Sequence, residues 1–117
     1  MARVALLCAD LLFGSKVEGA LKADNELTRF ASAAKALDSG QVFDVLVVDL
    51  TDSELDGVGA VAELKARQAL DGVAVLGFYS HVDQETRQRA EAGGFDRVVP
   101  RSRMAREAAA LVAGLAG

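Results

Sequence analysis

The chain has 117 residues, of which 51% are hydrophobic and 26% are charged, and its formal net charge is −4. This length and balance predict one globular domain over residues 1–117, with a core that needs no metal or disulfide. The single cysteine, Cys8, excludes an intrachain disulfide, and the acidic balance argues against a general nucleic-acid binder. No apolar stretch approaches the ~20 residues of a membrane span, and no signal peptide is recognisable, so we expect a cytoplasmic protein.

The first apolar run, residues 3–8, predicts a strand that ends on Cys8, a small buried hydrophobe. The following helix is predicted to begin at Ser15, because Ser15 and Glu18 form a capping box. Its core-facing residues are expected to be Val17, Ala20 and Leu21.

Two further strands with a short helix between them are predicted next. Residues 26–31 form a short and rather polar strand, which is typical of a sheet edge. Ser32 is a favourable cap for a helix through Leu37 that ends near Gly40. Residues 44–50 (DVLVVDL) are apolar at every central position, as expected for a parallel strand covered by helices on both faces.

The second half continues the same alternation. A helix after Gly57 is followed by a strand over residues 73–79, a polar helix over 82–93 and a short strand over 97–99. Ser102 is expected to cap the last helix. The apolar positions of the helix after Gly57 are Val58, Val61, Ala62 and Ala69. The apolar stripe of the last helix consists of Met104, Ala108, Leu111 and Leu115.

Five alternating strand–helix units predict an α/β fold: a doubly wound, three-layer, flavodoxin-like parallel sheet with strand order 2-1-3-4-5. In such sheets the functional groups lie at the carboxyl ends of the strands. The loops after Cys8, Val48 and Tyr79 are therefore expected to form the functional site.

Two motifs carry a resemblance to a known family. Asp49 closes the most buried strand, and Gly57 follows eight positions later. The segment EAGGFDRVVPR over residues 91–101 is the second motif. With the order of elements over essentially the whole chain, these resemble the receiver domain of bacterial response regulators. The resemblance implies that Asp49 accepts a phosphoryl group from a histidine kinase.

The chemistry of phosphoryl transfer to a carboxylate defines what the site needs. A carboxylate can attack phosphorus directly, with a divalent cation on oxygen ligands to neutralise developing charge. A second cation and a mobile hydroxyl complete the arrangement. The candidates are Asp49 as phosphoacceptor, Asp10 and Asp49 as Mg²⁺ ligands, Arg101 as the cation, and Tyr79 or Ser80 as the hydroxyl.

Several positions depart from the family pattern. Ala9-Asp10 stands where two carboxylates are expected, and Asp52-Ser53 replaces a Met-Pro pair. Pro100-Arg101 replaces the Lys-Pro pair, which exchanges a compact ammonium for a planar guanidinium. These departures predict weak Mg²⁺ affinity, no other cofactor, and impaired or absent phosphorylation.

Simpler roles are open for the same residues. Asp49 can cap the loop that follows it, and Asp10 can cap the first helix instead of binding a metal. His81 lies in the loop after the fourth strand and is a candidate for sensing acid or contacting a ligand, although an exposed loop histidine is more often idle. Arginines of the last third form either a solvated face or a docking surface for an acidic partner. They are Arg87, Arg89, Arg97, Arg101, Arg103 and Arg106.

The leading hypothesis is a stand-alone, non-enzymatic receiver-like signalling module that acts through protein–protein interaction. One alternative is a working response regulator that uses Asp49 with Mg²⁺, and another is a flavodoxin-like domain that binds a small ligand. Expected partners are a histidine kinase, a downstream signalling protein or a second copy of the chain, with no nucleic acid and no membrane. The resemblance places their docking surface on the fourth helix, fifth strand and fifth helix.

Overall fold

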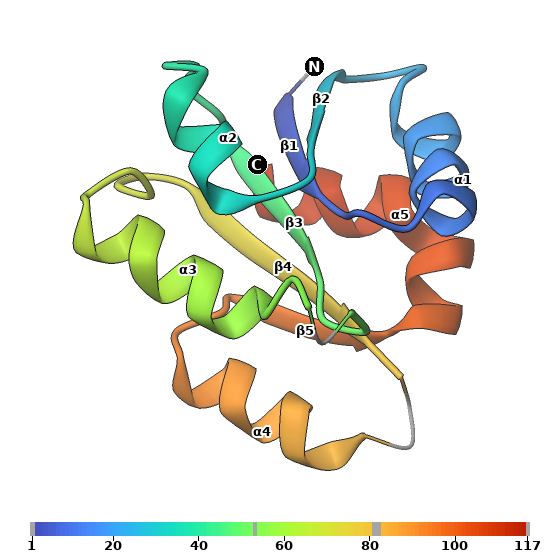
Figure 1. Cartoon of the computed structure of the whole chain (residues 1–117). Helices are drawn as coiled ribbons and strands as arrows, with labels where there is room; N and C mark the ends of the chain where they lie inside the picture. The colour runs from blue at the N-terminus through green and yellow to red at the C-terminus, as the bar shows by residue number, and fades with distance from the viewer. Residues whose placement is uncertain (1, 53, 81–82, 117) are drawn as a thin grey trace.

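The computed structural model describes residues 2–52, 54–80 and 83–116, and strands and helices alternate along the whole of that range (Figure 1). The strands are β1 (Arg3–Leu7), β2 (Glu26–Phe30), β3 (Val45–Asp49), β4 (Ala74–Tyr79) and β5 (Arg97–Pro100). The helices are α1 (Leu11–Leu21), α2 (Ala33–Asp38), α3 (Gly57–Ala66), α4 (Gln84–Ala92) and α5 (Arg101–Ala116). All strand pairs are parallel, and the sheet order β2-β1-β3-β4-β5 confirms the predicted topology.

The sheet separates two hydrophobic clusters, and β3 contributes to both. Every residue of β3 is buried, as its apolar sequence predicts. Val45 and Val47 pack toward α1 and α5, whereas Leu46 and Val48 pack toward α2 and α3. Since successive side chains of a strand point to opposite faces, the next residue, Asp49, lies on the same face as Val47. The acidic side chain therefore lies between the sheet and the α1–α5 layer.

Helix α1 is capped five residues earlier than predicted. Asp10 is its cap, with Oδ1 accepting hydrogen bonds from the backbone nitrogens of Leu12 at 2.9 Å and Phe13 at 3.1 Å. The expectation that Ser15 starts the helix is therefore wrong, because the earlier carboxylate already satisfies the first free amides. Val17 and Leu21 face the core as expected, but Ala20 is exposed. The earlier start also adds Phe13 and Gly14 to the buried face.

The remaining helices match their expected positions with small corrections. Ser32 caps α2 by accepting from the backbone nitrogen of Lys35, as predicted. Of the apolar positions expected in the helix after Gly57, Ala62 is exposed and Ala69 lies beyond the end of α3. Ser102 lies within the first turn of α5 rather than at its cap, because β5 passes directly into the helix at Arg101.

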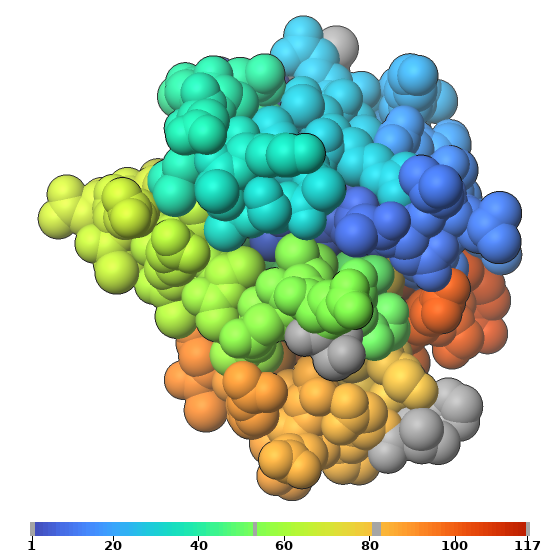
Figure 2. Space-filling model, viewed as in Figure 1, coloured from blue at the N-terminus to red at the C-terminus, as the bar shows by residue number. Residues whose placement is uncertain are grey.

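Helix α4, like α2, is weakly anchored to the sheet. It is capped by Asp83, and Ala90 is its one buried residue among those described. His81 and Val82, which precede the helix, lie outside the described residues. In the space-filling view the α4 segment (orange) lies beside the α3 segment (green) on one face of the molecule (Figure 2). None of the helices in the described range combines the length and apolar character that crossing a membrane requires.

Candidate functional site at the carboxyl edge of the sheet

Asp49 is fully buried and holds hydrogen bonds on both carboxylate oxygens. Its Oδ1 accepts from the backbone nitrogen of Thr51 at 2.8 Å and from Thr51 Oγ1 at 2.6 Å. Its Oδ2 accepts from Cys8 Sγ at 3.4 Å. Among the described residues, Asp49 is the one charged or polar residue that is buried, and 0% of its surface is exposed. The interpretation of Asp49 as a cap for its own loop is therefore confirmed, and its carboxylate is closed on all sides.

Cys8 is the residue from the end of β1 that contacts Asp49. The parallel register pairs Leu7 of β1 with Val48 of β3. The residues that follow them, Cys8 and Asp49, therefore lie side by side. Burial, reinforced by the charge of Asp49, raises the pKa of the Cys8 thiol from 9.0 to about 12. The thiol is therefore protonated at neutral pH and acts as a donor to the carboxylate.

Asp10 and Arg101 form a second pair at the same edge. Asp10 Oδ2 lies 3.4 Å from Arg101 Nη2, while the other oxygen of Asp10 caps α1. The guanidinium of Arg101 also lies over the Phe13 ring, 4.2 Å from its centroid. Asp10 therefore caps α1, which was one of the two roles that the sequence left open for it. The carboxylate of Asp10, a candidate Mg²⁺ ligand together with Asp49, is directed at the helix terminus and at Arg101.

Of the two candidate hydroxyls, Ser80 lies at the cleft and Tyr79 does not. Tyr79 is buried in the hydrophobic cluster on the α2–α3 face of the sheet, the face opposite to Asp49. Ser80 is half-buried and lines a cleft together with Thr51 and Arg101. Lys16, from the exposed side of α1, lines the same cleft. The cleft is therefore lined by two cationic side chains, Lys16 and Arg101, and by the hydroxyls of Thr51, Ser80 and Ser102.

Arg29 holds the loop between β1 and α1 in place. Its guanidinium donates to the backbone oxygens of Cys8 at 3.0 Å and Asp10 at 2.5 Å. It also lies 3.6 Å from a carboxylate oxygen of Glu18. Neither Arg29 nor Thr51 was identified from the sequence. The one available signal for Arg29 was a charged residue in the middle of a predicted edge strand, which is equally typical of a solvated edge.

The residues at this edge offer a divalent cation few free oxygen ligands. Mg²⁺ binds hard oxygen donors, and a protonated thiol such as Cys8 is not one of them. Both oxygens of Asp49 and both oxygens of Asp10 already have partners. The described residues contain no cluster of three or more His, Cys, Asp or Glu side chains placed to hold a metal. This donor set supports Mg²⁺ binding that is weak at most.

The fold of this chain is similar to that of solved receiver domains. The receiver domain of the Pseudomonas aeruginosa sensor histidine kinase PA1611, with a magnesium ion in its active-site cleft, superposes with a TM-score of 0.85. The two are 18% identical, over 99% of this chain and 98% of that one. The beryllofluoride-activated receiver domain of DrrB has a TM-score of 0.83 and 19% identity, over 98% and 97% of the two chains.

A third example is the receiver domain of the putative response regulator NarL from Mycobacterium tuberculosis. Its TM-score is 0.80 and its identity is 20%, over 98% of this chain and 95% of that one. No protein-family profile matches the chain, and no curated protein matches it. The chain therefore has the fold of receiver domains at an identity too low to carry over their residues.

Proposed function

We propose that this chain, which has the fold of response-regulator receiver domains, is a cytoplasmic, non-enzymatic signalling module whose phosphorylation at Asp49 is impaired or absent. The observation that carries the proposal is the closure of the Asp49 carboxylate by Cys8 and Thr51. A module of this kind acts through the proteins it binds rather than through turnover of a phosphoryl group.

Phosphoryl transfer to Asp49 would require several changes at once. A nucleophilic oxygen must approach phosphorus in line, with charge neutralised by a cation. Here one oxygen of Asp49 holds two bonds from Thr51, and the other faces the Cys8 thiol. Ala9 adds no carboxylate, since it carries only a methyl group. Breaking buried hydrogen bonds to a charged group costs roughly 1.5–3 kcal/mol each, which raises the barrier to attack.

Incubation with acetyl phosphate and Mg²⁺ tests the proposal, with intact mass as the readout. We expect no phosphoryl adduct on the wild-type chain under conditions that label a receiver domain with a complete acidic pair. Asp49→Asn is the matched control for adducts at other sites. An adduct on the wild type that Asp49→Asn removes would show that Asp49 is a working phosphoacceptor.

Magnesium titration gives an independent measurement on the same edge. The wild type should bind Mg²⁺ weakly, and Ala9→Asp should bind it more tightly, because affinity rises with the number of charged oxygen ligands. Equal affinities would place Ala9 away from any cation position.

A working phosphoacceptor at Asp49 is the second candidate. It is favoured by the cleft in which Arg101, Lys16 and Ser80 lie together, since cations and a hydroxyl suit phosphoryl oxygens. Two of the structurally similar chains, DrrB and PA1611, contain beryllofluoride and magnesium respectively. Beryllofluoride with Mg²⁺ should perturb the amides of Thr51 and Ser80 if this candidate is correct, and should leave them unchanged if Asp49 is closed.

The surface of α4, β5 and α5 is our proposed docking surface for a kinase, a downstream signalling protein or a second copy. Three of its arginines are exposed: Arg87 pairs with Glu91 at 2.9 Å, Arg89 lies 3.7 Å from Asp56, and Arg97 projects from β5. Helix α4 has little to bury, so its position can change at low cost. Association through such a surface should weaken as salt concentration rises.

Charge reversal tests this surface. Arg87→Glu, Arg89→Glu and Arg97→Glu combined should abolish capture of partner proteins by the immobilised chain, with little change in melting temperature, since all three side chains are exposed. A variant with the same charge change elsewhere, Arg3→Glu, Lys22→Glu and Arg67→Glu, serves as the control. Equal capture by both variants and the wild type would contradict the assignment.

A further inference from the structure

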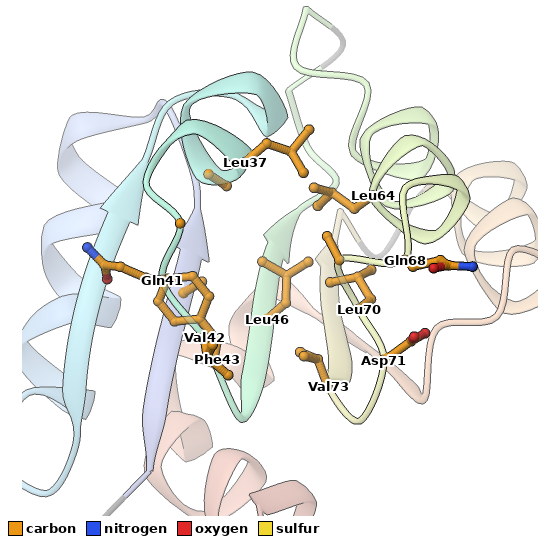
Figure 3. A pocket seen from close by; sticks show the side chains of 14 residues that line it. Leu37, Gln41, Val42, Phe43, Leu46, Leu64, Gln68, Leu70, Asp71 and Val73 are labelled. Carbon is orange, nitrogen blue, oxygen red and sulfur yellow. The ribbon is translucent and has the colours of Figure 1, made fainter.

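A hollow of about 360 Å³ lies between α2 and α3, at the opposite end of the sheet from Asp49 (Figure 3). Its floor is formed by Ala5, in the middle of β1, and by Leu46, near the amino-terminal end of β3, and its outer edge by the loops that precede β3 and β4. The hollow shares no lining residue with the carboxyl-edge cleft. It is therefore a separate feature from the candidate functional site.

The hollow exists because α2 is too short to cover its part of the sheet. Its six residues rise about 9 Å, whereas a five-residue strand such as β3 extends about 16 Å. Gly40, with φ of +64°, turns the chain away just after the helix. The loop returns through Val42 and Phe43, and the sheet face between this loop and α3 is left without a covering helix.

The larger part of the surface that faces the hollow is hydrocarbon, and a smaller part is polar. Apolar side chains come from α2, the loop before β3, β3 itself, α3 and the loop before β4, namely Leu37, Phe43, Leu46, Leu64, Leu70 and Val73. The polar lining residues turn their polar ends outward: Figure 3 shows the amides of Gln41 and Gln68 and the carboxylate of Asp71 directed away from the space. Gln41 is held in this direction by Thr28, whose hydroxyl donates to its Oε1 at 3.1 Å.

We propose that this hollow is a binding site for an uncharged, mostly apolar small molecule. Its volume lies in the range of about 300–1,000 Å³ that is typical of small-molecule sites, which are likewise lined mainly by hydrophobic side chains. A charged ligand is disfavoured, because burying a charge among aliphatic side chains without a partner is costly. An anion is disfavoured further by Asp71 at the rim and by the net charge of −4.

The surroundings of the hollow favour a small molecule over a protein partner. A stable protein interface needs about 800 Å² from each side, with an apolar centre. Among the described residues, the exposed large hydrophobic side chains are Leu11 and Leu12 on α1 and Val42, of which only Val42 lies at this rim. The neighbouring Lys35, Asp38 and Arg67 are exposed and charged. The apolar area is thus confined to the interior of the hollow.

Three probes with the same ring system test the chemistry of the site. The amide resonances of the chain are followed during titration with 1-naphthylmethanol, 1-naphthoate and 1-naphthylmethylamine. The neutral alcohol should bind tightest and the carboxylate weakest, and the shifted amides should belong to residues around the hollow. Shifts that centre on Leu11 and Leu12, or no shifts at probe saturation, would overturn the proposal.

A matched pair of substitutions on α2 tests the location. Ala36 is half-buried and lines the hollow, whereas Ala34 is exposed and does not. Ala36→Phe should weaken binding of 1-naphthylmethanol about tenfold or more, because the new ring occupies the apolar surface. Ala34→Phe should stay within about twofold of the wild type. Equal effects of the two substitutions would contradict a site in the hollow.

Two further measurements keep the proposal testable if Ala36→Phe fails to fold. Val42→Asp changes an exposed rim residue that is not needed for the core, and it should weaken binding of the neutral probe. Sedimentation of the wild type reports any second copy at this face. A dimer that Val42→Asp disrupts, in a chain that binds none of the probes, would assign the hollow to a second copy and overturn the small-molecule proposal.

Discussion

Cys8 Sγ lies 3.4 Å from Asp49 Oδ2, so a protonated thiol and a carboxylate meet in the interior at the carboxyl ends of β1 and β3. The contact supplies a donor to an oxygen that is shielded from water. Cys8 is therefore more than a small hydrophobic residue of the core, which was its expected role.

Substitution of Cys8 should reveal the value of this donor. Cys8→Ala leaves Asp49 Oδ2 without it, and we expect the free energy of unfolding to fall by about 1–3 kcal/mol. Cys8→Ser keeps a smaller hydrogen-bond donor, so its free energy of unfolding should lie between those of Cys8→Ala and the wild type. Urea denaturation of the three proteins measures the order, and a Cys8→Ala protein as stable as the wild type would show that the contact is energetically neutral.

The Cys8 thiol should also make stability depend on pH in the alkaline range. Its pKa is about 12 in the folded state and 9.0 without the environment of the fold. Between these values the unfolded chain has lost the proton and the native chain has kept it, so the unfolded state binds fewer protons and stability falls as pH rises. The difference in unfolding free energy between the wild type and Cys8→Ser should therefore shrink from pH 9 upward. A constant difference over this range would contradict the raised pKa.

Gly14 and Gly19 provide a matched pair on α1. A Cβ at Gly14 would collide with the guanidinium of Arg29, whereas a Cβ at Gly19 would meet nothing within 4 Å. Gly14→Ala should displace Arg29 from the loop carbonyls and destabilise the fold by about 1–3 kcal/mol. Gly19→Ala should stabilise it by about 0.5–1 kcal/mol through helix propensity. Thermal unfolding of both variants is the measurement, and stabilisation by both would mean that Arg29 relocates freely.

The corrected start of α1 leads to a set of three substitutions at Asp10 and Ser15. Asp10→Ala should cost about 1 kcal/mol, because it removes the acceptor for the amides of Leu12 and Phe13. Asp10→Asn keeps an oxygen in place and should recover most of that loss. Ser15→Ala should be nearly neutral, since Ser15 is exposed within the helix. Greater destabilisation by Ser15→Ala than by Asp10→Ala in urea denaturation would restore the capping box as the helix start.

The sequence by itself determined the architecture. Alternation of apolar strands with amphipathic helices predicted the elements, and the uninterrupted apolar run of β3 placed that strand in the centre of a parallel sheet. Local signals were reliable where a single cap was available, as at Ser32. They failed at α1, where Asp10 and Ser15 were both suitable caps. Capping propensity alone does not choose between an aspartate and a serine that lie so close together in the sequence.

Only the tertiary structure decided which side chains meet at the carboxyl edge. The sequence made Asp10 and Asp49 joint candidates for a Mg²⁺ site. The register of β1 against β3 brings Cys8 beside Asp49, and the carboxylate of Asp10 caps α1 and pairs with Arg101. The structure likewise decides which hydroxyl lies at the cleft. Tyr79, at the end of β4, packs into the hydrophobic cluster on the α2–α3 face of the sheet, whereas Ser80 lines the cleft. Periodicity determines which face of the sheet a residue occupies, whereas contacts across strands depend on a register and on loop paths that are set by packing of the whole domain.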